Sequence, residues 1–429
     1  MLQLEAKPEL RSAASESKRL LLNVRTWLLM GPLLYFAADG HLLTQNKDYA
    51  GQFSSGGDAA GGLVARIEQL LVWCLVCFIM SAAFPRVARA AARHKTFSVF
   101  ALLAFVSISW SPDPIDALRR SVLFGLTLLF SVYLAEYYDP QEQMLLILFT
   151  GAIAVIASYL VVLLLPGFGY GYEGEWKGIF GHKNDLGMYV IFLISPAFFL
   201  RLKQSLAGVA TAGLVGLAAV LVLMSQSRTA WLLAFVFACY VCAYKLIARF
   251  RRRDAVLLSV TVMSIAGLMI SLAVTQFDSL MQLLGKTADL SGRLQIWKAV
   301  AFAISKHPVL GYGYGGFWEQ SQGESMNVML AVGFPLGHAH NGYLNLWLQL
   351  GLVGLLLFIW SLVAATRNGV KSLWLDNQNY VAWCLGIILL VVVGNIDESF
   401  VMKYNSLAAM LYVMVCVGLS KSARGDYAE

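Results

Sequence analysis

Apolar runs of about twenty residues recur along almost the whole chain, and they limit the fold more than any other feature. Hydrophobic residues make up 59% of the 429 residues and charged residues only 13%, whereas a soluble domain contains roughly 25% charged residues. A soluble fold could not bury so much apolar surface. About 20 apolar residues are enough for a helix to cross the hydrocarbon layer of a membrane. The sequence therefore predicts an all-α polytopic membrane protein.

We expect twelve membrane-spanning helices in one domain, 1–429. Their approximate positions are 20–38, 63–84, 96–110, 119–137, 144–165, 184–200, 205–224, 229–249, 254–276, 341–364, 379–395 and 399–420. Residues 1–19 are polar and precede a run too long for the core of a signal peptide, so we expect a cytoplasmic tail. The longest segment between spans, 277–340, lies between the ninth and the tenth.

Lysines and arginines concentrate in alternate segments between the spans, as in "ARFRRR" at 248–253, although one of these segments, "YYDPQEQ", is acidic. Basic residues stay on the cytoplasmic side of a membrane, so we expect both chain ends in the cytoplasm. The segments 166–183, 225–228 and 277–340 would then lie on the outer face of the membrane. The net charge of +7 reflects this topology, and we expect no nucleic-acid partner.

Three short motifs that resemble cofactor sites do not indicate cofactor chemistry. "CLVC" at 74–77 and "CYVC" at 239–242 lie inside apolar runs, and no loop cysteine or histidine pair completes a metal site. We interpret these cysteines as small packing residues. "LGKT" at 284–287 lacks the glycine that a phosphate loop needs at position 280. We therefore expect no cofactor and no metal.

Two arginines outside the expected spans are candidates for binding an anion. Arg228 lies in "SQSRT", a cluster of hydrogen-bonding side chains between two apolar runs. Such a cluster is costly near a bilayer unless it meets a polar group, although an arginine that reaches lipid headgroups is an alternative. Arg293 follows Ser291, a candidate helix cap, and a cation in a first helical turn opposes the helix dipole unless an anion lies between them. The alternative for Arg293 is an ordinary surface arginine.

A helix is also predicted within the long segment, over "LSGRLQIWKAVAFAISKHP" at 290–308. Its apolar face would hold Leu294, Trp297, Val300, Ala301 and Ile304. Such an amphipathic helix would lie in the plane of the membrane interface.

Histidines and an asparagine stand directly before an apolar run at two places. "GHAHNGYLNLWLQLGLVG" at 337–354 contains His338, His340 and Asn341, and "WKGIFGHKNDLGMYV" at 176–190 contains His182, Lys183 and Asn184. Helix capping explains the asparagines but leaves the histidines without a role.

Loops rich in glycine and aromatic residues accompany them, "PGFGYGYEGEW" at 166–176 and "GYGYGGFW" at 311–318. Glycine allows close approach of backbone to a ligand, and aromatic faces suit sugar rings. Anchoring at the membrane interface is the alternative.

Arginines, histidines and aromatic loops suit glycosyl transfer from a lipid-linked sugar pyrophosphate. Arginine binds phosphate oxygens bidentately and keeps its charge, so it can stabilise the leaving pyrophosphate without magnesium. Histidine can accept the proton of an acceptor hydroxyl at neutral pH, and a single in-line displacement inverts the anomeric carbon. The acids expected in the outer segments are dispersed, so a hydrolase with paired carboxylates has no specific support.

The chain resembles the bacterial O-antigen ligase and exopolysaccharide polymerase superfamily. The resemblance covers about residues 100–360, and the most specific motif is "HAHNGYLNLWLQLGLVGLLLF" at 338–358. Further matching motifs are "WSPDPIDALRRS", "GIFGHKNDLG", "SRTAWL" and "GRLQIW…HPVLGYGYGGFW". The twelve-span layout with a long outer segment is similar too. The resemblance implies a GT-C-like architecture in a bacterial inner membrane, with the outer segments and the active site on the periplasmic face.

This resemblance implies a metal-independent, inverting glycosyltransferase whose donor is an undecaprenyl-diphosphate-linked glycan and whose acceptor is another glycan. The histidine before asparagine in the family motif maps to His340 as the general base, and the two pyrophosphate-binding arginines map to Arg228 and Arg293. His338 is an extra histidine beside the mapped base. The remaining candidate substrate-binding residues are His338, His182, Lys183, Asn184, Asn341 and Arg120.

Several activities remain open at this point. A polymerase that joins repeat units is favoured, because "GHKN" resembles the exopolysaccharide branch of the superfamily. A ligase that transfers finished glycan to lipid A–core or another acceptor shares the same donor and machinery. A flippase or transporter would place its charges at mid-membrane depth, and a scaffold would leave Arg228, Arg293 and His340 unexplained. A chain-length regulator and a flippase of the same pathway are candidate partners, besides the lipid bilayer.

Overall fold

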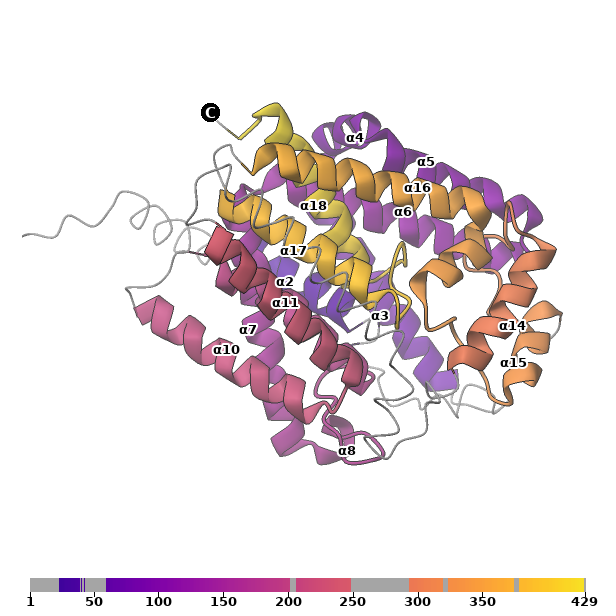
Figure 1. Cartoon of the computed structure of the whole chain (residues 1–429), viewed down its shortest axis with the longest axis horizontal. Coiled ribbons are helices and arrows are strands. Elements are labelled where there is room, and N and C mark those ends of the chain that lie inside the picture. Colours follow the sequence, from indigo (N-terminus) through magenta and orange to yellow (C-terminus); the bar gives the residue numbers. More distant parts are fainter. Residues whose placement is uncertain are drawn as a thin grey trace, which may run out of the picture.

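The computed structural model describes residues 23–38, 40, 42, 59–200, 206–247, 293–318, 323–373 and 378–427. These residues form helices joined by loops, plus an isolated antiparallel bridge between Tyr170 and Trp176 (Figure 1). The all-α fold class is thereby confirmed. The predicted tail 1–19 and the ninth span, 254–276, lie outside the described residues.

The first half of the described chain contains α2 (Val24–Ala37), α3 (Ala59–Ser81), α4 (Phe84–Arg93), α5 (Lys95–Val106), η2 (Ser107–Trp110), α6 (Pro114–Tyr137), α7 (Pro140–Leu164), α8 (Pro166–Gly169), α9 (Lys183–Ile194) and η3 (Ser195–Phe198). The second half contains α10 (Leu206–Met224), α11 (Arg228–Ile247), α14 (Arg293–Lys306), α15 (Glu324–Val332), α16 (Gly342–Ser372), α17 (Gln378–Gly394) and α18 (Leu407–Arg424).

Seven of the described helices are long and apolar enough to cross a membrane: α3, α6, α7, α10, α11, α16 and α18. Helices α4 and α5 with η2 form a further candidate that is bent by 94°. The chain is thus a polytopic helical membrane protein. The spans predicted at 20–38, 184–200 and 379–395 correspond to the shorter helices α2, α9 and α17. In α9 the helix stops before Pro196, which has no amide proton to donate, and the Ser195 hydroxyl donates to the Phe192 carbonyl instead.

Helix α18 lies at the centre of the bundle and α10 at its edge (Figure 1). In α18, 78% of an 18-residue window is buried, compared with 17% in α10. Large apolar side chains such as Leu71, Phe78, Phe235 and Trp360 remain exposed on α3, α11 and α16. A membrane supplies the apolar surroundings that these side chains need.

Helix α16 is broken at Gly351, and the segment that follows α14 packs against the break. Gly351 has a φ of 66°, and a Cβ there would lie 2.0 Å from the carbonyl oxygen of Val309. Only glycine permits both features. The Leu352 amide donates to the Pro308 carbonyl at 2.9 Å, and the Tyr312 amide donates to the Leu348 carbonyl at 2.9 Å. The glycine-rich segment 311–318 therefore fixes α14 against α16.

The helix predicted in the long segment exists as α14, but its buried face differs from the prediction. The buried residues are Ile296, Val300, Ala303 and Ile304, whereas Leu294 and Ala301 are exposed. The reason is tertiary packing: α14 covers a second hydrophobic core with α15, segment 312–318 and the start of α16. Ser291, the predicted cap, lies outside the described residues.

The twelfth span begins later than predicted. Residue 399 was expected to open a helix, but α18 starts at Leu407. Asn395 explains the intervening loop, because its side-chain oxygen accepts the amides of Phe400 (3.2 Å) and Val401 (2.9 Å). Met402 and Asn405 then adopt left-handed backbone, with φ of 49° and 55°. An irregular loop, 395–406, thus stands where the sequence indicated a tight turn.

Candidate functional site

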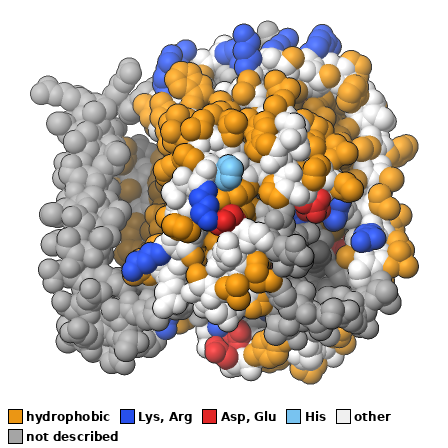
Figure 2. All heavy atoms as spheres, turned by 90° about the vertical axis from the view of Figure 1, so that its right-hand side faces the viewer, with side chains coloured by type: hydrophobic (Ala, Val, Ile, Leu, Met, Phe, Trp, Pro, Cys, Tyr) orange, Lys and Arg blue, Asp and Glu red, His pale blue; other side chains and the backbone are white. Residues whose placement is uncertain are grey.

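Five segments that are distant in sequence meet at one end of the bundle. They are the starts of α9, α11 and α14, the loop before α16, and the loop after α17. Figure 2 views the molecule from the side of α14 and shows a largely hydrophobic face with a few charged side chains. The meeting point is built around Asp397 and Glu398.

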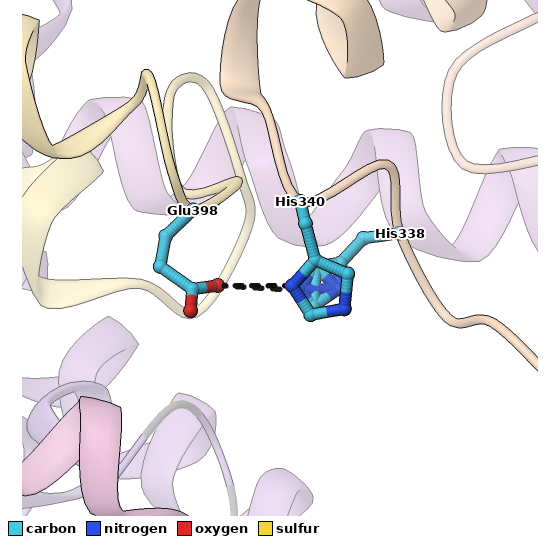
Figure 3. Close-up of side chains that lie close together, drawn as sticks. All are labelled: His338, His340 and Glu398. Atoms are coloured by element: carbon cyan, nitrogen blue, oxygen red, sulfur yellow. Dashed lines mark hydrogen bonds and ion pairs between the residues drawn. The ribbon is translucent and has the colours of Figure 1, made fainter. Parts of the chain in front are cut away.

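Glu398 joins four of the candidate residues. Its carboxylate accepts a hydrogen bond from the Asn184 amide nitrogen at 2.7 Å, and Arg293 lies 3.7 Å from the same oxygen, Oε1. The other oxygen, Oε2, lies 3.5 Å from His338 Nε2 and 3.6 Å from His340 Nδ1 (Figure 3). The side chain of Glu398 is only 10% exposed. A buried acid with these neighbours organises the site.

Asp397 ties two further segments to the same loop. It forms an ion pair with Arg293, whose side chain is 17% exposed, and accepts a hydrogen bond from the Thr229 hydroxyl. Ser227 in turn donates to the Asn184 side-chain oxygen at 2.7 Å. Arg293 is thus held by two carboxylates, which offset its unfavourable place at the first residue of α14.

The backbone before α16 is held in a fixed and unusual conformation. His340 has a φ of 46°, uncommon for a residue with a Cβ. Asn341 caps α16 as predicted, accepting the amides of Tyr343 and Leu344, while its own amide donates to the Ser399 hydroxyl at 3.1 Å. The Trp297 indole donates to the His340 carbonyl at 3.3 Å. These contacts aim both histidines at Glu398.

The site fixes the protonation of Glu398 and His338 at neutral pH. Burial alone would raise the pKa of Glu398, but the nearby polar and charged groups of His340, followed by His338 and Arg293, lower this pKa to about 2. Burial, followed by the charge of His340, lowers the pKa of His338 to about 3, although Glu398 acts in the opposite direction. The carboxylate is therefore ionised and the His338 imidazole neutral near pH 7.

We expect the protein to lose stability as the pH falls below about 6.5, the ordinary histidine pKa. Both folded-state pKa values are depressed, so below this pH the unfolded chain binds protons that the folded chain does not. For His338 the loss is about 1.4 kcal/mol per pH unit. Melting temperatures in detergent with EDTA at pH 7.5, 6 and 5 would show it. The decline should be shallower in His338→Gln, and an equally steep decline in that variant would contradict the assignment.

In the segment 182–184, the helix cap is not the residue expected from the sequence. His182 caps α9, because its Nδ1 accepts the Asn184 amide at 3.2 Å, so the prediction that Asn184 is the cap was wrong. Asn184 is instead free to contact Glu398 and Ser227. Burial, followed by the charges of Lys183 and His340, lowers the pKa of His182, against the charge of Glu398. Lys183 pairs with Glu173 at 3.3 Å and Glu175 at 3.5 Å.

Arg228 and Arg120 are placed differently from Arg293. Arg228 opens α11 beside Ser227 and Thr229, is exposed, and makes no ion pair or hydrogen bond with the described part of the chain. Arg120 pairs with Asp116 at 2.6 Å and lies over the Tyr404 ring, 5.6 Å from its centroid. Arg228 therefore presents a charge at the site, whereas Arg120 packs beneath the loop that carries Glu398.

Sequence reasoning missed Asp397 and Glu398. They follow the apolar run of α17 in "GNIDESF" at 394–400, and the acids considered from the sequence did not include them. Adjacent acids at the end of a membrane helix are expensive unless they are paired. That cost was the available signal.

A sequence comparison bears on this geometry. Residues 212–359 match the family profile described as O-Antigen ligase. The matched stretch contains Arg228, Arg293, His338 and His340, the cationic and histidine side of the site. The resemblance stated from the sequence is thereby confirmed: over residues 212–359 the chain is similar to the O-antigen ligase family.

Relatives of this O-antigen ligase-like chain have names that refer to polysaccharides and glycan transfer. The exopolysaccharide production protein ExoQ of Rhizobium meliloti is 28% identical over 309 residues, 68% of this chain and 69% of that protein. A general O-oligosaccharyltransferase of Acinetobacter baylyi is 27% identical over 55% of this chain and 45% of its own length. A putative polysaccharide ligase of Rickettsia felis is 35% identical over 85 residues, 19% of this chain and 21% of that protein.

Proposed function

We propose that this protein is a metal-independent, inverting glycosyltransferase that uses an undecaprenyl-diphosphate-linked glycan as donor and the hydroxyl of another glycan as acceptor. One observation carries the proposal: His340 and Arg293, both within the stretch that matches the O-antigen ligase profile, lie beside the buried carboxylate of Glu398. A base, its orienting acid and a fixed cation are the parts that this displacement needs.

His340 acts as the general base. Its Nδ1 faces Glu398, so the ring proton stays at Nδ1 and the lone pair of Nε2 accepts the proton of the acceptor hydroxyl. Glu398 holds this tautomer and stabilises the imidazolium that forms, as the aspartate does in a catalytic triad. The present separation of 3.6 Å exceeds a hydrogen bond, and such contacts tighten when substrate binds.

Arg228 and Arg293 bind the pyrophosphate of the donor. Arg293 is held in place by Asp397 and Glu398, and Arg228 extends from the neighbouring start of α11. Guanidinium groups match phosphate oxygens in geometry and charge. The charge that develops on the leaving pyrophosphate is thus stabilised without a metal ion.

The active site faces the periplasm of a bacterium whose inner membrane holds the protein. Helix α16 begins at the site and carries Arg367 and Lys371 near its other end, and α18 likewise ends with Lys421 and Arg424. Basic residues favour the cytoplasmic side, which supports an orientation with the site and 277–340 on the periplasmic face. Twelve spans with both chain ends in the cytoplasm are part of the proposal. A flippase of the same pathway would supply the lipid-linked donor, and a chain-length regulator would limit the length of the polysaccharide.

Polymerisation of repeat units is the favoured reaction, because the match to ExoQ covers about two thirds of both chains. Transfer of finished glycan to lipid A–core or another acceptor is the second candidate, supported by the O-antigen ligase profile. Analysis of the polysaccharide in a deletion strain decides between them. We expect single repeat units left on the lipid carrier, whereas long chains lacking their final acceptor would indicate a ligase. Normal attached polysaccharide would contradict both.

A further inference from the structure

His338, His340 and Glu398 have the composition and spacing of a metal site with three protein ligands. One ligand atom from each side chain lies within 4.8 Å of the other two. His338 Nε2 and His340 Nδ1 lie 3.5 and 3.6 Å from the same carboxylate oxygen. These separations are long for hydrogen bonds. Tetrahedral zinc, with bonds of about 2.0–2.1 Å, holds its ligand atoms about 3.4 Å apart.

The surroundings of the three side chains also suit a cation. Arg293 pairs most closely with Asp397. The negative charge of Glu398 is therefore available to interact with the histidines or with a bound cation. The second oxygen of Glu398 accepts the Asn184 hydrogen bond at 2.7 Å, and such outer contacts orient ligands in metal sites. The side chains of His338 and His340 are 20% and 26% exposed, so an ion can enter from solvent.

We propose that His338, His340 and Glu398 bind one Zn²⁺ ion, and that this ion inhibits the enzyme. Two imidazoles and a carboxylate form a ligand set that zinc takes with a fourth position open to water. Imidazole nitrogens also favour Zn²⁺ over Mg²⁺, which prefers oxygen ligands.

Inhibition follows from the chemistry of the His340 ring, and it rests on the function proposed above. A neutral imidazole has one lone pair and one N–H. When Zn²⁺ binds through a lone pair at Nδ1, the ring proton has to leave Nδ1, and the neutral ring then carries it on Nε2. The nitrogen that faces the acceptor is then a donor and cannot remove a proton. Zinc also occupies the carboxylate that would stabilise the imidazolium.

The test uses the purified full chain in detergent, freed of affinity tag, stripped with EDTA and dialysed. Titration calorimetry with zinc sulfate should give one ion per chain, and X-ray absorption should show two imidazole nitrogens plus oxygen. Glu398→Gln and His338→Ala should each weaken zinc binding by about tenfold or more. His307→Ala, which removes an exposed histidine packed on Tyr312, should bind zinc like the unaltered protein.

Activity is measured on the same protein. Glycan transfer should proceed in EDTA, fall as zinc saturates the calorimetric site, and recover when EDTA is added again. Equal zinc binding by all the variants, no binding at all, or transfer that rises with zinc would each overturn the proposal. An absence of transfer in EDTA would contradict the proposed function instead, while the calorimetry would still decide the site.

Discussion

His340→Ala is expected to lower the rate of glycan transfer by about 10³-fold and to stop polymer growth in cells, because it removes the general base. His338→Ala should cause a smaller loss. His338 turns its Nε2 toward Glu398, so its other nitrogen, close to the backbone, is poorly placed to meet an acceptor. His340 directs Nδ1 to the same carboxylate and keeps Nε2, the outer nitrogen of the ring, available.

The measurement is polysaccharide chain length in a deletion strain complemented by each variant, together with transfer rates of the purified proteins. Comparable amounts of each variant in the membrane exclude a folding defect. His307→Ala is the matched control, because this exposed histidine lies outside the site. A larger loss in His338→Ala than in His340→Ala would mean that the base is His338.

Arg293→Ala is the second change with a large expected effect, a loss of about 10³-fold in transfer. Alanine removes a donor to the pyrophosphate and also leaves Asp397 and Glu398 without their cation. Two uncompensated carboxylates would then repel the anionic donor. We therefore expect Arg293→Ala to be more damaging than Arg228→Ala, since Arg228 neutralises no acid in the described part of the chain.

Arg293→Lys separates charge from geometry, because lysine keeps the charge but lacks the bidentate fork. It should recover part of the lost activity. Arg119→Ala is the control, since Arg119 is 52% exposed and pairs only weakly, at 3.6 Å, with Asp116. The comparison requires transfer rates at several donor concentrations and melting temperatures in detergent. Full activity of Arg293→Ala in properly inserted protein would remove this residue from the mechanism.

Sequence periodicity was sufficient for elements whose burial is decided locally. Apolar runs predicted α3, α6, α7, α10, α11 and the start of α16 within a few residues, because a membrane helix must satisfy its own backbone and expose apolar side chains to lipid. Helix α16 continues to Ser372, beyond the predicted end at residue 364. The Asn341 cap of α16 is likewise a local contact. The buried face of α14 could not be predicted from local periodicity. Packing in the second hydrophobic core buries Ile296 and Ala303 and leaves Leu294 and Ala301 exposed.

The sequence by itself determined the membrane class, most helices and the resemblance that brings Arg228, Arg293 and His340 together as candidates. Only the tertiary structure decided which of them meet, since spatial proximity between ends of distant helices leaves no trace in local spacing. The loop 395–406 shows this best. Asn395 turns the backbone so that Asp397 reaches Arg293 and Glu398 reaches both histidines. Glu398 becomes the centre of the site because its carboxylate is buried away from solvent. Its charge must therefore be compensated by these neighbouring side chains.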